Sequence, residues 1–492
     1  MNPGLPWLPQ TAHRCGDGVA LRFEGRDLAW SWLAGEAASV AGGLARLGVQ
    51  RGDVVAVRMK PHPRFVALLH ALQVLGASML PLNLRLAEPE LQRLFEHAAP
   101  RLLLDDGSAK ATMPSARDMP CRHPFDDLGV ATALKSFTAP GRLDPEAALT
   151  LVATSGTTSL PKVVVLTNAN HAASAAASRR RLGHDGTDTW LAALPLYHVG
   201  GLSILARSAL EGSIVLMEES FEAARAAAAI ESGEATMVSM VPTMLSRVLD
   251  GGLASVSPRL RCLLVGGASL SPSLGRRALD AGLPVSATYG MTEASSQVCS
   301  TIPGSLEAAR GLVGLPLAGT EVSIARTDGD GWGEILVRGA TVMRGYLGNA
   351  EADGLAFTDD GWLRTGDLGR LEEGGALAVA GRRGDLVVTG GENVAPLEVE
   401  HVLDAHDDVE ASLVLGEEDR EWGERVVALV VARPGRTAEA ISLLTWCRER
   451  LAAYKVPREI RFVEALPTGP TGKLLRRGAA AQAISAARDR IQ

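Results

Sequence analysis

Apolar residues in the first hundred positions recur with two different periods. Short runs at residues 19–23 (VALRF) and 52–59 (GDVVAVRM) have the length and composition of β-strands. Residues 33–47 and 65–75 instead carry apolar side chains every three or four positions, which is typical of amphipathic helices. Gly76 ends the second helical stretch and leads into another apolar run, SMLPLN. This alternation predicts α/β structure.

The α/β pattern continues between residues 147 and 300, with helical stretches such as residues 221–233 between strands. Five apolar runs have the composition of buried strands: 148–154 (ALTLVAT), 189–196 (TWLAALPL), 235–242 (ATMVSMVP), 260–268 (LRCLLVGGA) and 284–290 (PVSATYG). We expect them to form one parallel sheet. Its strands would present TSGTTS, PLYHVGG, VPTML, GGAS and YGMTE at one edge, where ligands of open α/β sheets bind.

Past residue 310 the pattern changes to short strands joined by glycine turns. The runs EVSIA, GEILVRG, GWLRTGDLGRL and ALAVAGRRGDLVVTGG are typical of antiparallel pairs. A compact mixture of strands and helices follows Arg382 to Asp385, so we place a domain boundary there. The predicted fold class is α/β, with a large N-terminal domain (residues 1–382) of parallel-type sheets layered with helices plus a short-strand β region. A small α+β C-terminal domain would span residues 383–492.

Composition narrows the class of protein. A chain of 492 residues is too long for a single hydrophobic core, so we expect two or more domains. Its 46% hydrophobic residues are enough to form a core in each. The formal net charge of −7 argues against nucleic acid as a partner, because nucleic acids bind basic surfaces. Five scattered cysteines without a CxxC pair fit neither a disulfide framework nor a zinc site. No apolar run reaches the ~18 residues of a membrane span, and no leader pattern opens the sequence, so we expect a cytoplasmic protein.

Residues 154–162, TSGTTSLPK, place many hydroxyl groups between two apolar runs. Backbone N–H groups and hydroxyls there could wrap an anion, with Gly156 allowing close backbone approach and Lys162 adding positive charge. The spacing is not GxxxxGK[ST], and no GxGxxG follows a strand, so conventional nucleotide motifs are absent. We interpret the stretch as a phosphate-binding loop.

The phosphate loop is the first of six motifs along the chain. They are TSGTTSLPK (154–162), YGMTE (289–293), TGD (365–367), GRRGD (381–385), GGENVAP (390–396) and PTGPTGK (467–473). Their order and spacing resemble the adenylate-forming superfamily of acyl-CoA synthetases, peptide-synthetase adenylation domains and beetle luciferases. The resemblance covers nearly the whole chain.

This resemblance implies a two-step reaction. A carboxylic acid and ATP form an acyl-adenylate with release of pyrophosphate, CoA then takes the acyl group, and a small C-terminal domain moves between the steps. The residues expected to bind ATP are Thr154, Ser155, Gly156, Thr157, Thr158, Lys162, Gly266, Gly267, Ala268, Tyr289, Gly290, Met291, Thr292, Asp367 and Arg382. Glu293 and Thr157 would hold Mg²⁺, a hard cation suited to one carboxylate plus phosphate oxygens.

Individual roles follow from the same resemblance. Tyr289 would stack on adenine, and Asp367 would accept hydrogen bonds from the ribose hydroxyls with help from Arg382. Lys473 would bridge the attacking carboxylate and the α-phosphate, as the family's adenylation lysine does. The predicted catalytic residues are therefore Lys473, Glu293 and His198.

The resemblance implies that three glycines act in the second half-reaction. Gly384 occupies the hinge position, where glycine permits a large backbone rotation. Gly390 and Gly391 would lie beside the pantetheine tunnel for CoA.

The phosphate loop departs from the family pattern at two positions. Relatives usually read TSGTTGxPKG, but Ser159 and Val163 replace two of those glycines here, which removes backbone freedom from the phosphate loop.

Further stretches resemble the o-succinylbenzoate-CoA ligases of menaquinone biosynthesis. These are LPLYHVGGLSIL (194–205), MVSMVPTMLSRVL (237–249), GGASLSPSL (266–274), YGMTEASSQV (289–298) and VVTGGENVAPLEVE (387–400). That acid carries an aromatic carboxylate, a keto bridge and the reacting succinyl carboxylate. The candidate acid-binding residues are His198, Gly200, Gly201, Leu202 and Ser203 on one wall and Ser295, Ser296 and Gln297 on the other. Arg207 is a candidate cationic anchor for the second carboxylate.

We therefore expect an AMP-forming acid–thiol ligase that joins o-succinylbenzoate to CoA with ATP and Mg²⁺. Another aryl- or acyl-CoA ligase of the superfamily stays open, as does a non-catalytic nucleotide-binding relative in which Ser159 and Val163 mark lost function. The expected partners are a small carboxylic acid, ATP and CoA, without nucleic acid or a membrane span, and a homodimer stays open.

Overall fold

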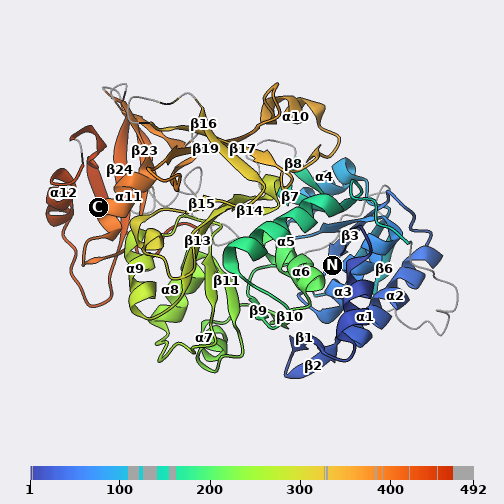
Figure 1. Cartoon of the computed structure of the whole chain (residues 1–492). Helices are drawn as coiled ribbons and strands as arrows, with labels where there is room; N and C mark the ends of the chain where they lie inside the picture. Colours follow the sequence, from blue (N-terminus) through green and yellow to red (C-terminus); the bar gives the residue numbers. More distant parts are fainter. Residues whose placement is uncertain are drawn as a thin grey trace.

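In the part of the chain that it describes, the computed structural model contains four β-sheets with helices packed on them (Figure 1). It describes residues 2, 4–108, 121–125, 141–154, 162–325, 327, 331–382, 385–389, 392–419, 422–451 and 453–468. The predicted α/β class is confirmed, with parallel and antiparallel strands in the same sheets.

The largest sheet has nine strands. In spatial order they are β15 (Leu315–Pro316), β14 (Ser296–Ser300), β13 (Val285–Met291), β12 (Cys262–Val265), β11 (Met237–Met240), β9 (Thr189–Ala192), β10 (Ile214–Met217), β1 (Val19–Phe23) and β2 (Arg26–Ala29). The strands from β13 to β1 in this order run parallel. Antiparallel strands close both edges.

A second sheet has seven strands. They are β18 (Gly345–Tyr346), β8 (Lys162–Thr167), β7 (Ala148–Thr154), β4 (Ser78–Pro81), β3 (Val54–Arg58), β5 (Leu102–Asp105) and β6 (Cys121–Pro124). β7 lies here, parallel to β4 and antiparallel to β8, so the prediction of one parallel sheet containing residues 148–154 is wrong. Leu149 and Leu151 face different hydrophobic cores. A strand buried on both faces has the same apolar pattern in either sheet.

Helices fill the space between these two sheets. α1 (Trp7–Cys15), α2 (Trp30–Arg46), α3 (Pro63–Leu75), α5 (Asn168–Leu182) and α6 (Val199–Glu211) contribute side chains to one hydrophobic core together with strands of both sheets. Figure 1 shows α5 and α6 side by side in the middle of the molecule. The outer faces are covered by α4 (Glu88–Ala98), α7 (Ala223–Glu231), α8 (Pro242–Asp250) and α9 (Pro272–Asp280).

α3 shows how local sequence sets helix ends. His62 precedes the helix, and its ring nitrogen Nδ1 accepts a hydrogen bond from the Arg64 backbone N–H at 3.2 Å. Pro63 stands in the first turn, where its missing N–H costs nothing. Gly76 ends the helix with a positive φ of 70°, as the sequence predicts.

The C-terminal third contains two further sheets. The four-stranded antiparallel sheet comprises β16 (Thr320–Ala325), β17 (Gly333–Gly339), β19 (Leu363–Leu371) and β20 (Leu377–Arg382), with α10 (Ala350–Ala356) beside it. The five-stranded sheet comprises β22 (Glu392–Val394), β21 (Val387–Thr389), β24 (Gly423–Ala432), β23 (Val409–Asp419) and β25 (Glu459–Phe462). α11 (Pro396–Asp404) and α12 (Ala440–Arg448) pack on it.

The last sheet contacts the rest of the molecule through α11. This helix packs against β20 and α9. His401 on α11 lies 3.2 Å (Nε2 to Oγ) from Ser269, in the loop between β12 and α9. The five-stranded sheet is thereby linked to a loop at the carboxyl end of a strand of the nine-stranded sheet.

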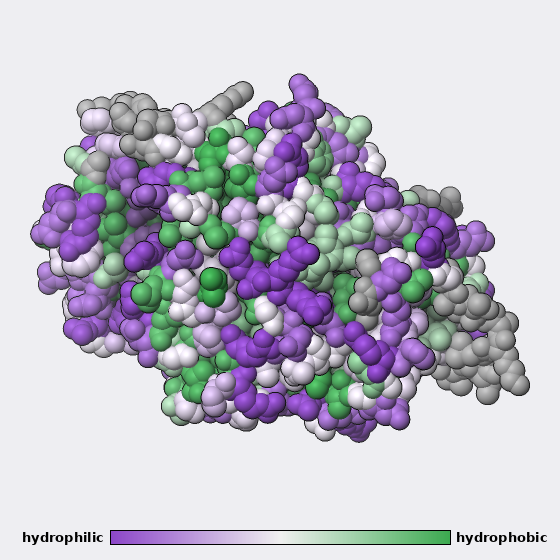
Figure 2. All heavy atoms as spheres, viewed as in Figure 1, coloured by the Kyte–Doolittle hydropathy of each residue, from purple (hydrophilic) through white to green (hydrophobic). Residues whose placement is uncertain are grey.

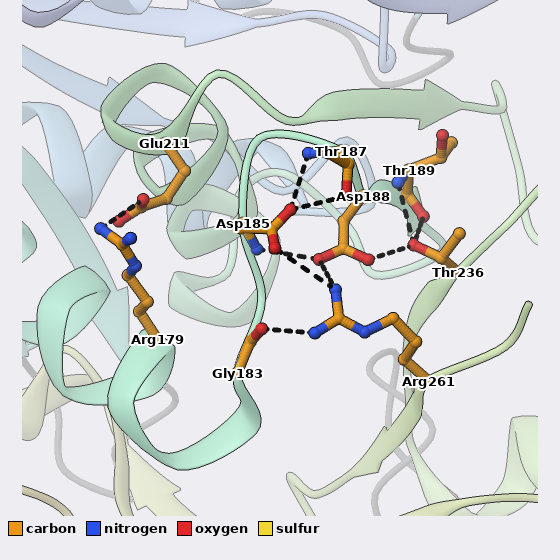
Figure 3. Close-up of polar contacts among 9 residues, drawn as sticks. All are labelled: Arg179, Gly183, Asp185, Thr187, Asp188, Thr189, Glu211, Thr236 and Arg261. Atoms are coloured by element: carbon orange, nitrogen blue, oxygen red, sulfur yellow. Dashed lines mark hydrogen bonds and ion pairs between the residues drawn. The ribbon is translucent and has the colours of Figure 1, made fainter.

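A polar network fastens the starts of three parallel strands (Figure 3). Asp188, immediately before β9, is 1% exposed and accepts a hydrogen bond from Thr236 Oγ1 at 2.6 Å. Arg261, immediately before β12, donates to Asp188 Oδ2 at 2.7 Å and to the Gly183 carbonyl at 2.5 Å. Since Thr236 precedes β11, the network holds the amino ends of β9, β11 and β12 and the end of α5 together.

The visible surface mixes hydrophilic and hydrophobic residues without a continuous apolar band (Figure 2). Among the residues that the structure describes, no helix has both the length and the apolar character needed to cross a membrane.

Candidate functional site

The loops that follow the parallel strands meet at one edge of the nine-stranded sheet. β9, β11, β12 and β13 run in the same direction, so the segments after their carboxyl ends emerge on the same side. These segments are PLYHVGG, VPTML, GGAS and YGMTE, as the sequence predicts. Open α/β sheets bind ligands at this edge.

Gly266 and Gly267 follow β12 where it approaches β13. A Cβ atom at Gly266 would lie 2.5 Å from Thr288 Cγ2, so a side chain there would displace the Thr288 side chain on β13. Gly267 has a φ of 78°, a conformation that glycine adopts without strain. Gly267 and Ala268 are exposed, which leaves this turn open to a ligand.

Tyr289, Asp367 and Arg382 form a chain of polar contacts across two sheets. The Tyr289 hydroxyl on β13 donates to Asp367 Oδ2 on β19 at 2.7 Å. Arg382 on β20 is paired in register with Asp367, and its Nε lies 3.5 Å from Asp367 Oδ1. Burial, followed by the negative charge of Asp367, raises the pKa of Tyr289 well above its usual value, so the phenol remains a donor. The structure thus brings together three residues that the sequence assigns to adenosine.

The YGMTE segment makes a tight turn into β14. A Cβ at Gly290 would lie 1.6 Å from the Ser296 carbonyl oxygen, so glycine is required for the antiparallel pairing of β13 and β14. Ser295 and Ser296 have φ angles of 53° and 100°, which serine rarely adopts. Hydrogen bonds hold Ser295: its hydroxyl donates to the Thr341 carbonyl, and its carbonyl accepts from the Ser174 hydroxyl, both at 2.7 Å.

Glu293 and Lys162 both contact Tyr346, an aromatic residue that the sequence reasoning did not select. Glu293 belongs to the short 3₁₀ segment Thr292–Ala294, and its Oε1 accepts a hydrogen bond from the Tyr346 hydroxyl at 3.0 Å. Lys162 Nζ lies 5.0 Å from the centroid of the Tyr346 ring. Thr154 pairs with Lys162 across β7 and β8, so both ends of the predicted phosphate loop are placed near Glu293.

The acid-binding candidates lie on α6 and β14, which contact each other. His198 precedes α6, and its ring lies 4.6 Å (centroid to centroid) from that of Tyr197. Gly201 packs so closely that a Cβ would lie 2.4 Å from the Pro195 carbonyl oxygen. The Ser203 hydroxyl donates to the Gly200 carbonyl at 2.9 Å, and Leu202 lies in the core between the sheets.

Arg207 is a buried cation near this wall. Its side chain is almost completely buried, donates through Nη2 to Gln297 Oε1 at 2.9 Å, and lies 5.1 Å from the Trp190 ring centroid. Burial lowers the pKa of Arg207 to about 10, so the guanidinium remains charged at neutral pH. Arg207 Nε and Gln297 Nε2 are buried donors without a hydrogen-bond partner. Within the described residues, Arg207 forms no ion pair with a carboxylate.

Several predicted site residues lie outside the described part of the chain. They are Ser155, Gly156, Thr157, Thr158, Gly384, Gly390, Gly391 and Lys473, together with Ser159. Their assigned roles stay predictions.

The described residues contain no cluster of three or more His, Cys, Asp or Glu side chains that could hold a metal ion. Mg²⁺ is suited to one or two carboxylates together with phosphate oxygens and water, so Glu293 would be one ligand of the ion, and this role stays a prediction. In the structure the Glu293 carboxylate is oriented by the Tyr346 hydroxyl.

Comparison with known proteins identifies the family. The model for AMP-binding enzymes matches residues 8–347, and the model for their C-terminal domain matches residues 398–473. The 2-succinylbenzoate–CoA ligase of Geobacillus kaustophilus is 38% identical over 479 residues, covering 96% of each chain.

Solved structures agree with this match. The o-succinylbenzoate CoA synthetase (MenE) of Bacillus subtilis in complex with the acyl-adenylate intermediate OSB-AMP has a TM-score of 0.87 and 34% identity, covering 96% of this chain and 98% of that one. The same synthetase with ATP and magnesium ion has a TM-score of 0.86 and 34% identity, covering 96% and 98%. With family models and relatives matched over nearly its full length, the chain belongs to the AMP-binding enzymes.

Proposed function

We propose that the chain is a 2-succinylbenzoate–CoA ligase that converts 2-succinylbenzoate, ATP and CoA into 2-succinylbenzoyl-CoA, AMP and pyrophosphate. The observation that carries this proposal is full-length similarity to curated ligases of that name, 38% identical over 96% of the chain. The polar constellation at the carboxyl edge of the nine-stranded sheet supports it, since each of its elements suits ATP or a carboxylic acid.

The first half-reaction activates the acid. An oxygen of the succinyl carboxylate attacks the α-phosphorus of ATP, a phosphorus–oxygen bond forms, and pyrophosphate leaves. Asp367, fixed by Tyr289, would bind the ribose hydroxyls, and Lys162 would bind phosphate oxygens from the base of its loop. Glu293 would ligate Mg²⁺, which when bound neutralises charge on the phosphates. These contacts align the reactants, which is a large part of catalysis for such a transfer.

The second half-reaction transfers the acyl group. The CoA thiolate attacks the acyl carbon, the mixed anhydride breaks, and AMP leaves with its phosphate oxygen. We propose two units for this step, residues 1–382 and 383–492, that rotate about Gly384. Support comes from the sheets: β20 ends at Arg382 in one sheet, and β21 begins at Val387 in another.

Arg207 supports an acid with a second carboxylate. A buried, uncompensated charge costs several kcal/mol, and an anion that reaches it offsets much of that cost. Arg207 Nε and Gln297 Nε2 offer two donors for such a group. The aromatic carboxylate of 2-succinylbenzoate would meet this requirement, whereas fatty acids and benzoate would not.

An acid panel tests the function. Pyrophosphate release is measured with 2-succinylbenzoate, its aromatic methyl ester, benzoate and a medium-chain fatty acid, and hydroxylamine traps the adenylate. We expect 2-succinylbenzoate to give the highest kcat/KM and 2-succinylbenzoyl-CoA to appear when CoA is added. Preference for another acid would refute the assignment and favour another acyl- or aryl-CoA ligase. No hydroxamate with any acid would favour a non-catalytic nucleotide-binding relative.

Arg207→Met sharpens the test. This substitution removes a charge-assisted contact with the second carboxylate, which contributes about 2 kcal/mol or more to binding. KM for 2-succinylbenzoate should therefore rise roughly 30-fold or more. The methyl ester, which lacks the second charge, should respond much less. Equal effects on both acids would show that Arg207 has only a structural role.

A further inference from the structure

Tyr346 contacts two predicted ligands of the metal–triphosphate complex, Glu293 and Lys162. Its hydroxyl donates to Glu293 Oε1 at 3.0 Å, and its ring centroid lies 5.0 Å from Lys162 Nζ. A cation at that distance over an aromatic face is attracted by the ring. One side chain therefore contacts both the carboxylate expected to hold metal and the ammonium expected to hold phosphate.

The surrounding structure fixes Tyr346 firmly. β18 pairs antiparallel with β8, so that Tyr346 lies opposite Val164, two residues from Lys162. The Tyr346 backbone N–H donates to Asp353 Oδ1 at 2.7 Å. Its side chain is 8% exposed, so its position cannot drift as that of a surface tyrosine can. Just before it, the Met343 backbone N–H donates to the Glu293 carbonyl at 2.8 Å. The same short segment thus holds both the backbone and the side chain of Glu293.

Lys162 and Glu293 carry opposite charges in the same candidate site, and Tyr346 contacts both of them. If Lys162 and Glu293 paired with each other, neither would be available for metal and phosphate. In the part of the chain that the structure describes, they form no ion pair: each instead contacts a different part of Tyr346. The hydroxyl contact occupies Glu293 Oε1 and orients the carboxylate, while the ring holds the ammonium on its face.

We propose that Tyr346 is a positioning residue that holds Glu293 and Lys162 apart and aimed at the metal–triphosphate complex. The inference rests on the proposed function, because it takes Glu293 as a Mg²⁺ ligand and Lys162 as a phosphate ligand. It adds a residue that lies outside all six sequence motifs. Its hydroxyl and its ring have separable tasks, one for the metal and one for the phosphate.

Removing the hydroxyl alone tests the metal-related task. Mn²⁺ binding is followed by electron paramagnetic resonance, in the full-length protein saturated with α,β-methylene-ATP and without any acid, so that no turnover occurs. Tyr346→Phe should weaken Mn²⁺ binding roughly tenfold, the lower end of what loss of an outer-shell partner costs a metal site. The affinity for the analogue without metal should change less than twofold, because the ring under Lys162 is kept. Tyr346→Leu, which also removes the ring, should weaken both.

Tyr454→Phe is the matched control. Lys455 Nζ lies 5.7 Å from the Tyr454 ring centroid, so this exposed tyrosine, in the 3₁₀ segment Ala453–Lys455, has the same kind of neighbour without the contact to Glu293. It should bind Mn²⁺ and the analogue as the unsubstituted protein does. Thermal melting of each variant establishes that it is folded before binding is compared.

The outcomes separate this inference from the proposed function. Mn²⁺ binding within twofold of the unsubstituted protein in folded Tyr346→Phe would overturn the inference, even if the acid panel identifies 2-succinylbenzoate. So would the absence of Mn²⁺ binding by the unsubstituted protein with the analogue. A tenfold loss of Mn²⁺ affinity together with failure of 2-succinylbenzoate in the panel would retain the inference and refute the assigned acid.

Discussion

The Tyr289 hydroxyl donates a hydrogen bond to the Asp367 carboxylate at 2.7 Å and thereby joins two sheets. β13 carries the tyrosine within the nine-stranded sheet, and β19 carries the aspartate within the four-stranded sheet. The contact holds Asp367 in one orientation before nucleotide arrives. An acceptor for ribose hydroxyls that is already oriented loses less freedom on binding.

Tyr289→Phe should therefore weaken nucleotide binding while keeping the aromatic face. We expect KM for ATP to rise roughly five- to thirtyfold, since a hydrogen bond to a charged group contributes about 1–2 kcal/mol when partly compensated by water. The preference for ATP over 2′-deoxy-ATP should fall as well, because Asp367 is less well placed. Pyrophosphate release with both nucleotides measures this. An unchanged preference would show that Asp367 does not act on the ribose, and Tyr454→Phe, at an exposed position, serves as control.

Lys473→Ala should separate the two half-reactions. Adenylate formation should fall roughly 10²- to 10³-fold, because a preorganised charge at the α-phosphate is lost. Thioester formation from supplied acyl-adenylate and CoA should be largely retained. Lys60→Ala removes an exposed lysine that pairs with Glu219 and should affect neither step. Equal loss in both half-reactions of Lys473→Ala would contradict its assigned role.

The contact between His401 and Ser269 predicts a bias in domain orientation. It links α11 to the loop after β12 in an arrangement that matches the OSB-AMP complex of the Bacillus subtilis synthetase with a TM-score of 0.87. Loss of this partly exposed hydrogen bond should destabilise that arrangement by about 0.5–1.5 kcal/mol. We expect His401→Ala to slow adenylate formation two- to tenfold and to leave thioester formation unchanged or faster.

A double-mutant cycle checks that interpretation. Ser269→Ala should reproduce the effect of His401→Ala, and the double variant should lose no more than either single variant. Additive losses would mean that the two residues act independently.

The pH dependence of the free energy of unfolding should reveal the titration of Asp404. Burial raises the pKa of Asp404 to about 8, the Ser412 hydroxyl opposes this shift, and the neighbouring charge of Glu400 adds to it. The folded protein therefore holds a proton that the unfolded chain releases near pH 4. The resulting stability is fully present below about pH 4 and is lost as pH rises toward about 8, with a slope of at most about 1.4 kcal/mol per pH unit.

Asp404→Asn removes this titration. Chemical denaturation at pH 5.5 and pH 8 should show a smaller loss of unfolding free energy in the variant than in the unsubstituted protein. A parallel pH dependence in both proteins would place the titration elsewhere. Asp250→Asn, at an exposed position paired with Arg277, provides the control.

Much of the site could be predicted from local sequence. Gly266, Tyr289 and Asp367 are predicted because short stretches around them resemble the adenylate-forming superfamily, and they follow or lie on strands that the apolar pattern identifies. The pairing of strands that are far apart in the sequence could not be predicted from local sequence. Residues 148–154 are apolar on both faces, so nothing in that run distinguishes the seven-stranded from the nine-stranded sheet.

Tyr346 escaped sequence reasoning for a related reason. Its role depends on Glu293, 53 residues away, whose side chain meets it only in the folded protein. A signal was present in VMRGYLGN: Gly345 has a φ of 151°, and a Cβ there would lie 2.8 Å from an Asp353 carboxylate oxygen. A glycine required beside an aromatic residue marks a tightly built turn. The contact between Arg207 on α6 and Trp190 on β9 likewise joins two elements that are separate in the sequence, so no local motif predicts it.

The network of Asp188, Thr236 and Arg261 fastens strands at the rim farthest from the chemistry. Rigidity and substrate choice are thus assigned to opposite ends of the same strands. Loops at the reactive rim can be varied without loosening the strands that carry them. Directed evolution toward new carboxylic acids should accordingly keep these three residues constant and place its diversity in the loops after β9 and β13.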